Sequence, residues 1–144
     1  MKDLFPQEKP EVLIVDDDEA LCRSMLKILG ARHIPAHAVN SGEAAVEELV
    51  RKPYDVVLLD VKMPGISGIG VMKEMRRRGI TAEVVVLSGH ASLETAVEIV
   101  ECGAYDYLLK PSAMDEILLK ISGAFDQKRE KDKVRQPGPG PSRS

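Results

Sequence analysis

The sequence predicts an α/β fold in which the five strands of a parallel sheet alternate with five helices. Short apolar runs recur along the chain, at residues 12–15, 34–39, 56–59, 84–87 and 105–109. Between these runs, apolar residues recur every three or four positions, which is the spacing of a helix with one buried face. Strands that alternate with helices form a parallel sheet whose right-handed crossovers place helices on both faces.

The strand-like runs differ in a way that predicts their places in the sheet. Residues 56–59 and 84–87 are continuously apolar and rich in β-branched side chains, which is typical of central parallel strands buried on both faces. The run at 34–39 contains Pro35 and the polar His37, so we predict an edge strand there.

Each intervening segment carries an apolar stripe that predicts the packed face of a helix. The stripes are Leu21, Met25, Ile28 and Leu29; Val46, Leu49 and Val50; Met72 and Met75; Leu93, Ala96, Val97 and Val100; and Met114, Ile117, Leu118, Ile121 and Phe125. Ser41 is the predicted N-cap of the second helix, because its hydroxyl can accept a hydrogen bond from the first turn. Gly103 is predicted to follow the fourth helix directly.

The length of 144 residues suits one ordinary domain. We expect residues 1–10 to form a loose lead-in, residues 11–127 the domain, and residues 128–144 a charged and then Pro/Gly-rich disordered tail or linker. The basic run at 128–135 has a second interpretation, because it can also continue the fifth helix.

Composition argues against several classes of protein. Residues 128–144 carry six basic side chains against Glu130 and Asp132, and the whole chain has a net charge of −3, so residues 1–127 carry −7. An acidic body with 3% aromatic residues argues against direct nucleic-acid binding. No apolar run is long enough to span a bilayer, and Cys22 and Cys102 are too few for a disulfide scaffold, so we expect a cytoplasmic protein.

Polar side chains follow the predicted strands at the points where the strands end. They are Asp16, Asp17 and Asp18 after the first strand, Asp60 after the third, Ser88 after the fourth and Lys110 after the fifth. Ligands of open α/β sheets bind beyond the carboxyl ends of the strands, so these groups are expected to form one site.

A cluster of carboxylates at this edge needs a cation. Two carboxylates about 4 Å apart repel by roughly 4 kcal/mol at an effective dielectric constant near 20. Oxygen ligands with room for water suit Mg²⁺, and Mg²⁺ would neutralise incoming phosphoryl oxygens while Lys110 and Ser88 bind others. Asp60, at the end of a central strand, is the best candidate for a nucleophile that forms an aspartyl phosphate.

Four separated segments together resemble the response-regulator receiver domain of two-component signalling. They are VLIVDDD at 12–18, VVLLDVKMPGISG at 56–68, LSGH at 87–90 and GAYDYLLKP at 103–111. The resemblance covers residues 10–127 and implies a flavodoxin-like (βα)5 doubly wound sheet with the strand order 2-1-3-4-5. Residues 89–97 and 103–107 are similar to those of receivers from NtrC-type transcriptional activators.

The resemblance implies a role for each site residue. Asp60 would accept the phosphoryl group, and the metal ligands would be Asp16, Asp17, Asp60 and the backbone carbonyl of Lys62. Lys110 would pair with the phosphoryl group, and its bond to Pro111 is expected to be cis. Ser88 would be the switch hydroxyl and Tyr107 the switch aromatic residue.

The resemblance also implies partners. The phosphoryl donor would be a sensor histidine kinase or a phosphotransfer protein, and the output domain or output partner cannot be read from the sequence. The family suggests a homodimer through the fourth and fifth helices. Neither nucleic acid nor a membrane is expected to bind this domain directly.

Two alternative functions remain open at this point. A haloacid-dehalogenase-like phosphohydrolase would use Asp16 as nucleophile and Asp18 as acid and base, although Ala20 departs from that pattern and no late acidic metal motif follows the fourth strand. A receiver-shaped docking module would never become phosphorylated, although the complete set of acceptor, acidic pair, hydroxyl and lysine argues against it.

Overall fold

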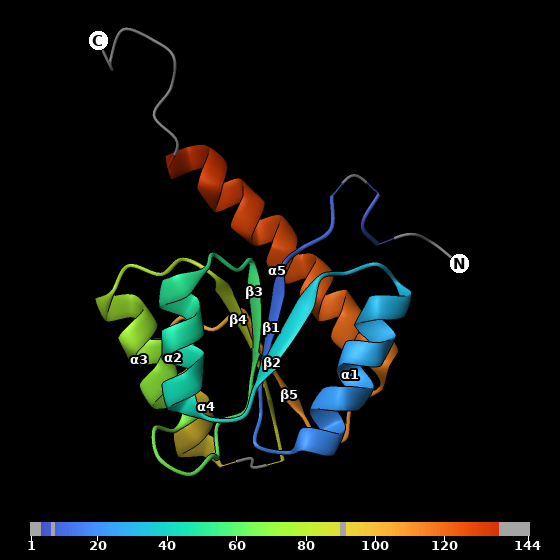
Figure 1. Ribbon diagram of the computed structural model, residues 1–144. Coiled ribbons are helices and arrows are strands. Elements are labelled where there is room, and N and C mark those ends of the chain that lie inside the picture. The colour runs from blue at the N-terminus through green and yellow to red at the C-terminus, as the bar shows by residue number, and fades with distance from the viewer. Residues whose placement is uncertain (1–3, 7, 90–91, 136–144) are drawn as a thin grey trace, which may run out of the picture.

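The computed structural model describes residues 4–6, 8–89 and 92–135, so the expected tail at 136–144 lies outside the described residues. Five parallel strands form one sheet in the order β2-β1-β3-β4-β5 (Figure 1). The strands are β1 (Val12–Val15), β2 (Ala36–Val39), β3 (Val56–Leu59), β4 (Glu83–Ser88) and β5 (Asp106–Leu109). The predicted fold class and strand order are confirmed.

The burial of the strands follows their places in the sheet. Every residue of β1, β3 and β4 is buried, because these inner strands are covered on both faces. In β2, at one edge, His37 is exposed and the other residues are half-buried. The prediction of an edge strand at this place is therefore confirmed.

Five helices alternate with the strands: α1 (Glu19–Ala31), α2 (Gly42–Arg51), α3 (Gly68–Arg77), α4 (Leu93–Glu101) and α5 (Met114–Arg135). Four of them begin after a side chain that caps the first turn. Asp18, Ser41, Ser67 and Ser92 each accept a hydrogen bond from the backbone N–H three residues further on, which satisfies a donor that the helix leaves unpaired. The predicted cap at Ser41 is confirmed, and Gly103 follows α4 with a φ of 88°.

The helices form two layers around the sheet. Figure 1 shows α1 and α5 over one face and α2, α3 and α4 over the other. Alternate residues of a strand point to opposite faces, so Leu58 packs in the core with α1 and α5 while Val57 packs in the core with α2 and α3. No helix within the described residues is long and apolar enough to cross a bilayer.

The apolar stripe predicted for α4 is not its packed face. Leu93 is 82% exposed and Val100 is 73% exposed, whereas Ile99 is 1% exposed and packs in the core. The sequence contains apolar residues on both sides of this helix, and the larger set faces outward. The expectation of a packed stripe is therefore wrong for Leu93, Val97 and Val100, whereas Ala96 is half-buried.

The helix α5 continues to Arg135, so the predicted domain boundary at residue 127 falls inside a helix. The second interpretation of residues 128–135 is the one that the structure supports. Lys131 forms an ion pair with Glu83 at the start of β4, with 2.8 Å between Nζ and Oε2. In Figure 1 this part of α5 extends past the amino ends of the strands, opposite the edge where the predicted site lies.

Part of the expected loose lead-in packs against α5. Phe5 is 7% exposed, and its ring centroid lies 6.5 Å from that of Phe125. The Ser122 hydroxyl donates a hydrogen bond of 3.3 Å to the carbonyl of Leu4. The expectation of a loose lead-in is therefore wrong for Leu4 and Phe5.

Candidate functional site

The sheet topology brings the predicted site residues to one edge. The strands β1 and β3 pair in register, with Val15 beside Leu59, so Asp16 and Asp60 follow neighbouring strands at the same level. The Asp60 N–H donates a hydrogen bond of 2.9 Å to the carbonyl of Val15, which holds the two loops together where they leave the sheet. On the other side of β3, Ser88 ends β4.

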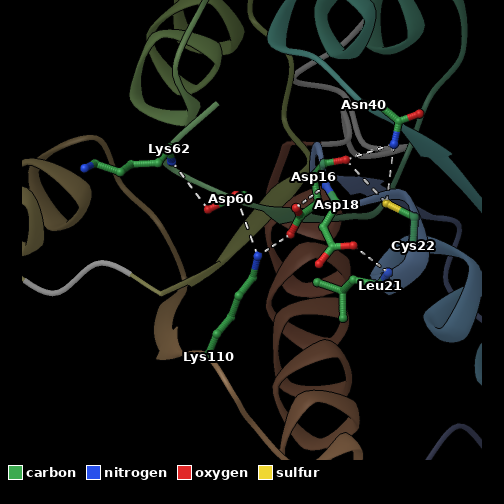
Figure 2. A network of polar contacts seen from close by, with 8 residues as sticks. All are labelled: Asp16, Asp18, Leu21, Cys22, Asn40, Asp60, Lys62 and Lys110. Atoms are coloured by element: carbon green, nitrogen blue, oxygen red, sulfur yellow. Dashed lines mark hydrogen bonds and ion pairs between the residues drawn. The ribbon is translucent and has the colours of Figure 1, made fainter. Parts of the chain in front are cut away.

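Lys110 extends between the two buried carboxylates (Figure 2). Its Nζ donates a hydrogen bond of 2.6 Å to Oδ2 of Asp16 and lies 3.7 Å from Oδ2 of Asp60. Asp16 is 3% exposed and Asp60 is 7% exposed, so these charges interact in a partly dehydrated environment where they are weakly screened. The peptide bond between Lys110 and Pro111 is cis, as expected.

The electrostatics of the site differ between Asp60 and Lys110. Burial and the nearby Asp16 carboxylate raise the pKa of Asp60, and Lys110 only partly offsets them. Burial by itself would lower the pKa of Lys110, but the hydrogen bond and the charge of Asp16, together with the charge of Asp60, raise it overall. The Lys110 ammonium is therefore strongly held in its charged form. Burial destabilises the charged form of Asp60, and a further cation nearby would reduce this destabilisation.

Three carboxylates fit a divalent cation. Asp16, Asp17 and Asp60 each offer an oxygen, and these oxygens lie within 4.8 Å of one another. Asp17 is exposed, so the cluster is open to solvent on that side. The three carboxylates carry three negative charges, and the Lys110 ammonium neutralises one of them. The two negative charges that remain are the number that Mg²⁺ balances. The donor set therefore fits the predicted metal.

Lys62 contacts Asp60 through its backbone. Its N–H lies 3.4 Å from Oδ1 of Asp60, and Figure 2 shows its side chain extending away from the carboxylates. The side chain is exposed. The role of the Lys62 carbonyl as a ligand stays a prediction.

Ser88 and Tyr107 lie on the neighbouring strands β4 and β5. Ser88 is 1% exposed, and its hydroxyl lies close enough to the Asp60 carboxylate to lower the pKa of that carboxyl, against the larger effect of burial. Tyr107, on the neighbouring strand β5, is half-buried and packs against the core that contains Val61. Their switch roles stay predictions.

Asp18 belongs to the helix cap and not to the carboxylate cluster. Its Oδ1 accepts a hydrogen bond of 3.1 Å from the N–H of Leu21, which caps α1 (Figure 2). Among the described residues, the group that could hold a metal contains Asp16 and Asp17 but not Asp18. The engagement of the Asp18 carboxylate in the cap of α1 argues against its use as the acid and base of a haloacid-dehalogenase-like mechanism.

The sequence did not predict that Asn40 and Cys22 are neighbours of the site. The side-chain amide of Asn40 donates a hydrogen bond of 2.9 Å to the carbonyl of Asp16, and the thiol of Cys22 donates to the same carbonyl at 3.5 Å (Figure 2). Burial and the charge of Asp16 raise the pKa of Cys22 to about 11, so this thiol stays protonated at neutral pH. Asn40 directly follows β2, so a survey of every strand end would have found it.

Comparisons with known proteins agree with this geometry. Residues 12–122 match the family described as the response regulator receiver domain. The chain is 35% identical over 124 residues to the regulatory protein AtoC of Escherichia coli strain K12, covering 86% of this chain and 27% of that protein. It is 30% identical over 124 residues to the transcriptional regulator NtrC of the same strain, covering 86% and 26%. The chain thus spans about a quarter of the length of these curated relatives.

Solved receiver structures share the fold. The signal receiver domain of a putative LuxO repressor protein from Vibrio parahaemolyticus has a TM-score of 0.83 at 25% identity, covering 90% of this chain and 100% of that one. A CheY-like receiver domain from Methanospirillum hungatei JF-1 has a TM-score of 0.80 at 26% identity, covering 86% and 99%. Sequence and structure together show that this chain belongs to the response-regulator receiver-domain family of two-component signalling, in which phosphorylation of an aspartate is the standard function.

Proposed function

We propose that Asp60 accepts a phosphoryl group from the phosphohistidine of a sensor histidine kinase or a phosphotransfer protein. One observation carries this assignment: the buried Asp60 carboxylate lies next to a hydroxyl, an ammonium and two further carboxylates. These are the groups that bind phosphoryl oxygens and a divalent cation.

In the proposed transfer, an oxygen of Asp60 attacks phosphorus, the P–N bond to the donor imidazole breaks, and its electron pair returns to the ring nitrogen. Asp16, Asp17, Asp60 and the Lys62 carbonyl would hold Mg²⁺, which when bound neutralises charge on the phosphoryl oxygens. Lys110 pairs with one phosphoryl oxygen, and Ser88 donates a hydrogen bond to another. The domain acts mainly through positioning and charge neutralisation, so it catalyses only its own phosphorylation and dephosphorylation.

The proposed response to phosphorylation follows from the same contacts. The Ser88 hydroxyl moves toward the new phosphoryl oxygens, and Tyr107 turns into the space that Ser88 leaves. This favours one of two existing arrangements of α4, β5 and α5, and a shift from 1:99 to 99:1 needs a difference of about 5.5 kcal/mol. The exposed apolar residues of these elements, Leu93, Val97, Val100, Leu109 and Leu119, support an output surface there.

We place the protein in the cytoplasm, where its two free cysteines stay reduced.

The proposed output surface also indicates the partners. The phosphorylated domain pairs with a second copy through α4 and α5 or contacts an output domain through them. Light scattering before and after phosphorylation checks the pairing: a doubled mass is expected, and an unchanged monomer mass would contradict it.

The acceptor is tested with a small phosphodonor. Incubation with acetyl phosphate and Mg²⁺ is expected to add one phosphoryl group, measured as a single mass shift that disappears when EDTA replaces Mg²⁺. Asp60→Asn is expected to abolish the shift, whereas Asp18→Asn, which changes only the cap of α1, is expected to retain it. Equal labelling of Asp60→Asn and the unaltered protein would show that the acceptor assignment is wrong.

A further inference from the structure

Residues 40–43, which comprise the connection between β2 and α2 and the first two residues of α2, contact both loops that carry the proposed site. It contains none of the acceptor, ligand or switch residues. One of its ends contacts the loop after β1, which carries Asp16 and Asp17, and the other contacts the loop after β3, which follows Asp60 and carries Lys62.

At the first end, backbone and side chain both hold Asp16. The Asp16 N–H donates a hydrogen bond of 3.2 Å to the carbonyl of Val39, the last residue of β2. The Asn40 side-chain amide donates to the Asp16 carbonyl at 2.9 Å and lies 3.7 Å from the sulfur of Cys22 (Figure 2). The peptide groups on both sides of the Asp16 side chain are therefore fixed to the end of β2.

At the second end, α2 lies directly against the loop after β3. The Ile66 N–H donates a hydrogen bond of 3.2 Å to Oε2 of Glu43. Gly65 has a φ of +76°, and a Cβ at that position would lie 2.7 Å from the same Glu43 oxygen. A Cβ at Gly42 would collide with the carbonyl oxygen of Ile66, so the backbones approach as closely as the absence of a side chain allows.

Each contacted segment is closed by its own hydrogen bonds. Ser41 caps α2 through a hydrogen bond of 3.1 Å from the Ala44 N–H, which fixes residues 41–44 relative to one another. The loop after β3 is closed by the Gly68 N–H, which donates to the Val61 carbonyl at 2.9 Å. A displacement at one end of residues 40–43 is therefore transmitted to the other.

We propose that residues 40–43 form a brace that sets the separation of the two loops, with Asn40 and Glu43 as positioning residues for the cation and phosphoryl site. Lys110 offsets only part of the repulsion between the carboxylates that follow β1 and β3, and in metal-free protein the brace opposes the resulting separation. This inference rests on the proposed function for its consequence, namely metal affinity, but the mechanical coupling itself can be measured in metal-free protein.

The test compares Asn40→Ala, Glu43→Ala and the double variant by titration with magnesium chloride in a calorimeter. Each single variant is expected to weaken Mg²⁺ binding about tenfold, the lower end of the loss seen elsewhere when groups that orient metal ligands are removed. Because a brace fails when either end is released, the double variant is expected to bind Mg²⁺ no more weakly than the weaker-binding single variant. Two independent local effects would instead multiply to about 100-fold.

Amide hydrogen exchange without metal gives a second readout. Asn40→Ala is expected to accelerate exchange several-fold in residues 62–67, which Asn40 does not contact, and Glu43→Ala to accelerate exchange at residues 16–18. Glu43→Gln keeps an acceptor oxygen and is expected to restore the values of the unaltered protein. Glu47→Ala, an exposed change on the next turn of α2, is the matched control and is expected to change neither readout.

The outcomes separate the two proposals. If the unaltered protein fails to bind Mg²⁺ or to accept a phosphoryl group, the proposed function is wrong, and exchange across the brace still decides whether the coupling exists. If the unaltered protein is active and Asn40→Ala leaves exchange at residues 62–67 unchanged, the brace is wrong. Multiplicative losses of affinity in the double variant would also overturn it.

Discussion

Lys110 is the residue on which the charge balance of the site depends. Its ammonium forms a close ion pair with Asp16 and lies 3.7 Å from Asp60, so Asp60 is the less well neutralised of the two buried carboxylates. This is consistent with the raised pKa of Asp60, whose causes are burial first and the charge of Asp16 second. The arrangement that suits phosphoryl binding therefore lowers the stability of the metal-free protein.

Asp60→Asn is expected to stabilise the metal-free domain at neutral pH. An acid whose pKa is higher in the folded state costs stability once the pH exceeds its unfolded pKa, and the amide removes that cost. The gain expected from removing one partly compensated repulsion is on the order of 1 kcal/mol. Thermal unfolding in EDTA at pH 7 measures it, and Asp126→Asn on the exposed face of α5 is the control.

Addition of Mg²⁺ should reverse that difference. The unaltered protein gains stability from binding, by about 2.7 kcal/mol at a Mg²⁺ concentration one hundred times the dissociation constant. Asp60→Asn has one carboxylate ligand fewer and gains less. A melting temperature of Asp60→Asn at or below that of the unaltered protein in EDTA would contradict the electrostatic argument.

Residue types at strand ends were sufficient to predict which side chains gather at this edge of the sheet, namely Asp16, Asp17, Asp60, Ser88 and Lys110. Parallel strands put their carboxyl ends at one edge, so residue type and position along the chain predicted the cluster. Asn40 and Glu43 were missed because they act on backbone groups, and a hydrogen bond to a backbone carbonyl or N–H requires no matching residue type in the sequence.

At the scale of elements, the last turns of α5 are held by an ion pair with β4. Glu83 is 3% exposed, and Lys131 is the cation next to its Oε2. Sequence analysis could place residues 128–135 either in the helix or in a tail, because charged residues with few apolar ones give no periodic signal. The buried carboxylate of Glu83 favours the helix, since only a helix continuing from Phe125 brings Lys131 to it.

Lys131→Met is expected to destabilise the domain and loosen the end of α5. It leaves the Glu83 carboxylate buried without its cation, and because Lys131 itself is half-exposed we expect a loss of about 1–2 kcal/mol. Urea unfolding measures the loss, and amide exchange at residues 128–135 reports the loosening. Lys133→Met, whose ion pair with Glu130 is exposed on both sides, is the matched control.

A second change distinguishes lost pairing from lost packing. Glu83→Gln in the Lys131→Met background replaces the stranded charge with a neutral amide, so it is expected to recover part of the stability. If the double variant is less stable than Lys131→Met alone, the ion pair does not account for the position of α5.

The helix α4 shows where periodicity fails. A single stripe of apolar residues predicts a buried face, but Leu93 and Val100 are exposed and Ile99 packs instead. Periodicity reports that a helix has apolar faces, and the neighbouring elements decide which of them is covered. An apolar face left open to solvent in this way is typical of an interaction site.

At the scale of the whole molecule, the free energy of unfolding is expected to fall in acid, because several carboxylates are more stable in their charged form in the folded protein than in the unfolded chain. The hydrogen bond from Tyr54 lowers the pKa of Glu48, and the hydrogen bonds from Arg77 and Arg78 lower the pKa of Glu74 to about 2. Burial raises the pKa of Asp106, but the contact with Lys120 and the hydrogen bond from the Tyr107 N–H lower it overall. The unfolded chain therefore binds more protons in acid than the folded domain does.

Apart from Asp60, whose raised pKa acts in the opposite direction, the free energy of unfolding is expected to be at its plateau above pH 5 and to fall as the pH drops from about 4.5 toward 2. This window runs from the ordinary pKa values of 4.5 for Glu and 3.8 for Asp down to the lowered value of Glu74. Urea unfolding across this range measures the fall. Asp106→Asn is expected to flatten the curve and the exposed Glu47→Gln to leave its shape unchanged, whereas parallel curves for all three proteins would contradict the assignment of Asp106.

The sequence by itself determined the alternation of strands and helices, the strand at the edge, and the residue types of the site. These depend on local patterns and on the rule that parallel strands end at one edge. Only the tertiary structure decided which face of α4 is buried, that Phe5 and Lys131 belong to the packed body, and that residues 40–43 join the two loops of the site. Each of these depends on contacts between segments far apart along the chain, and such contacts leave no periodic trace in the residues that make them.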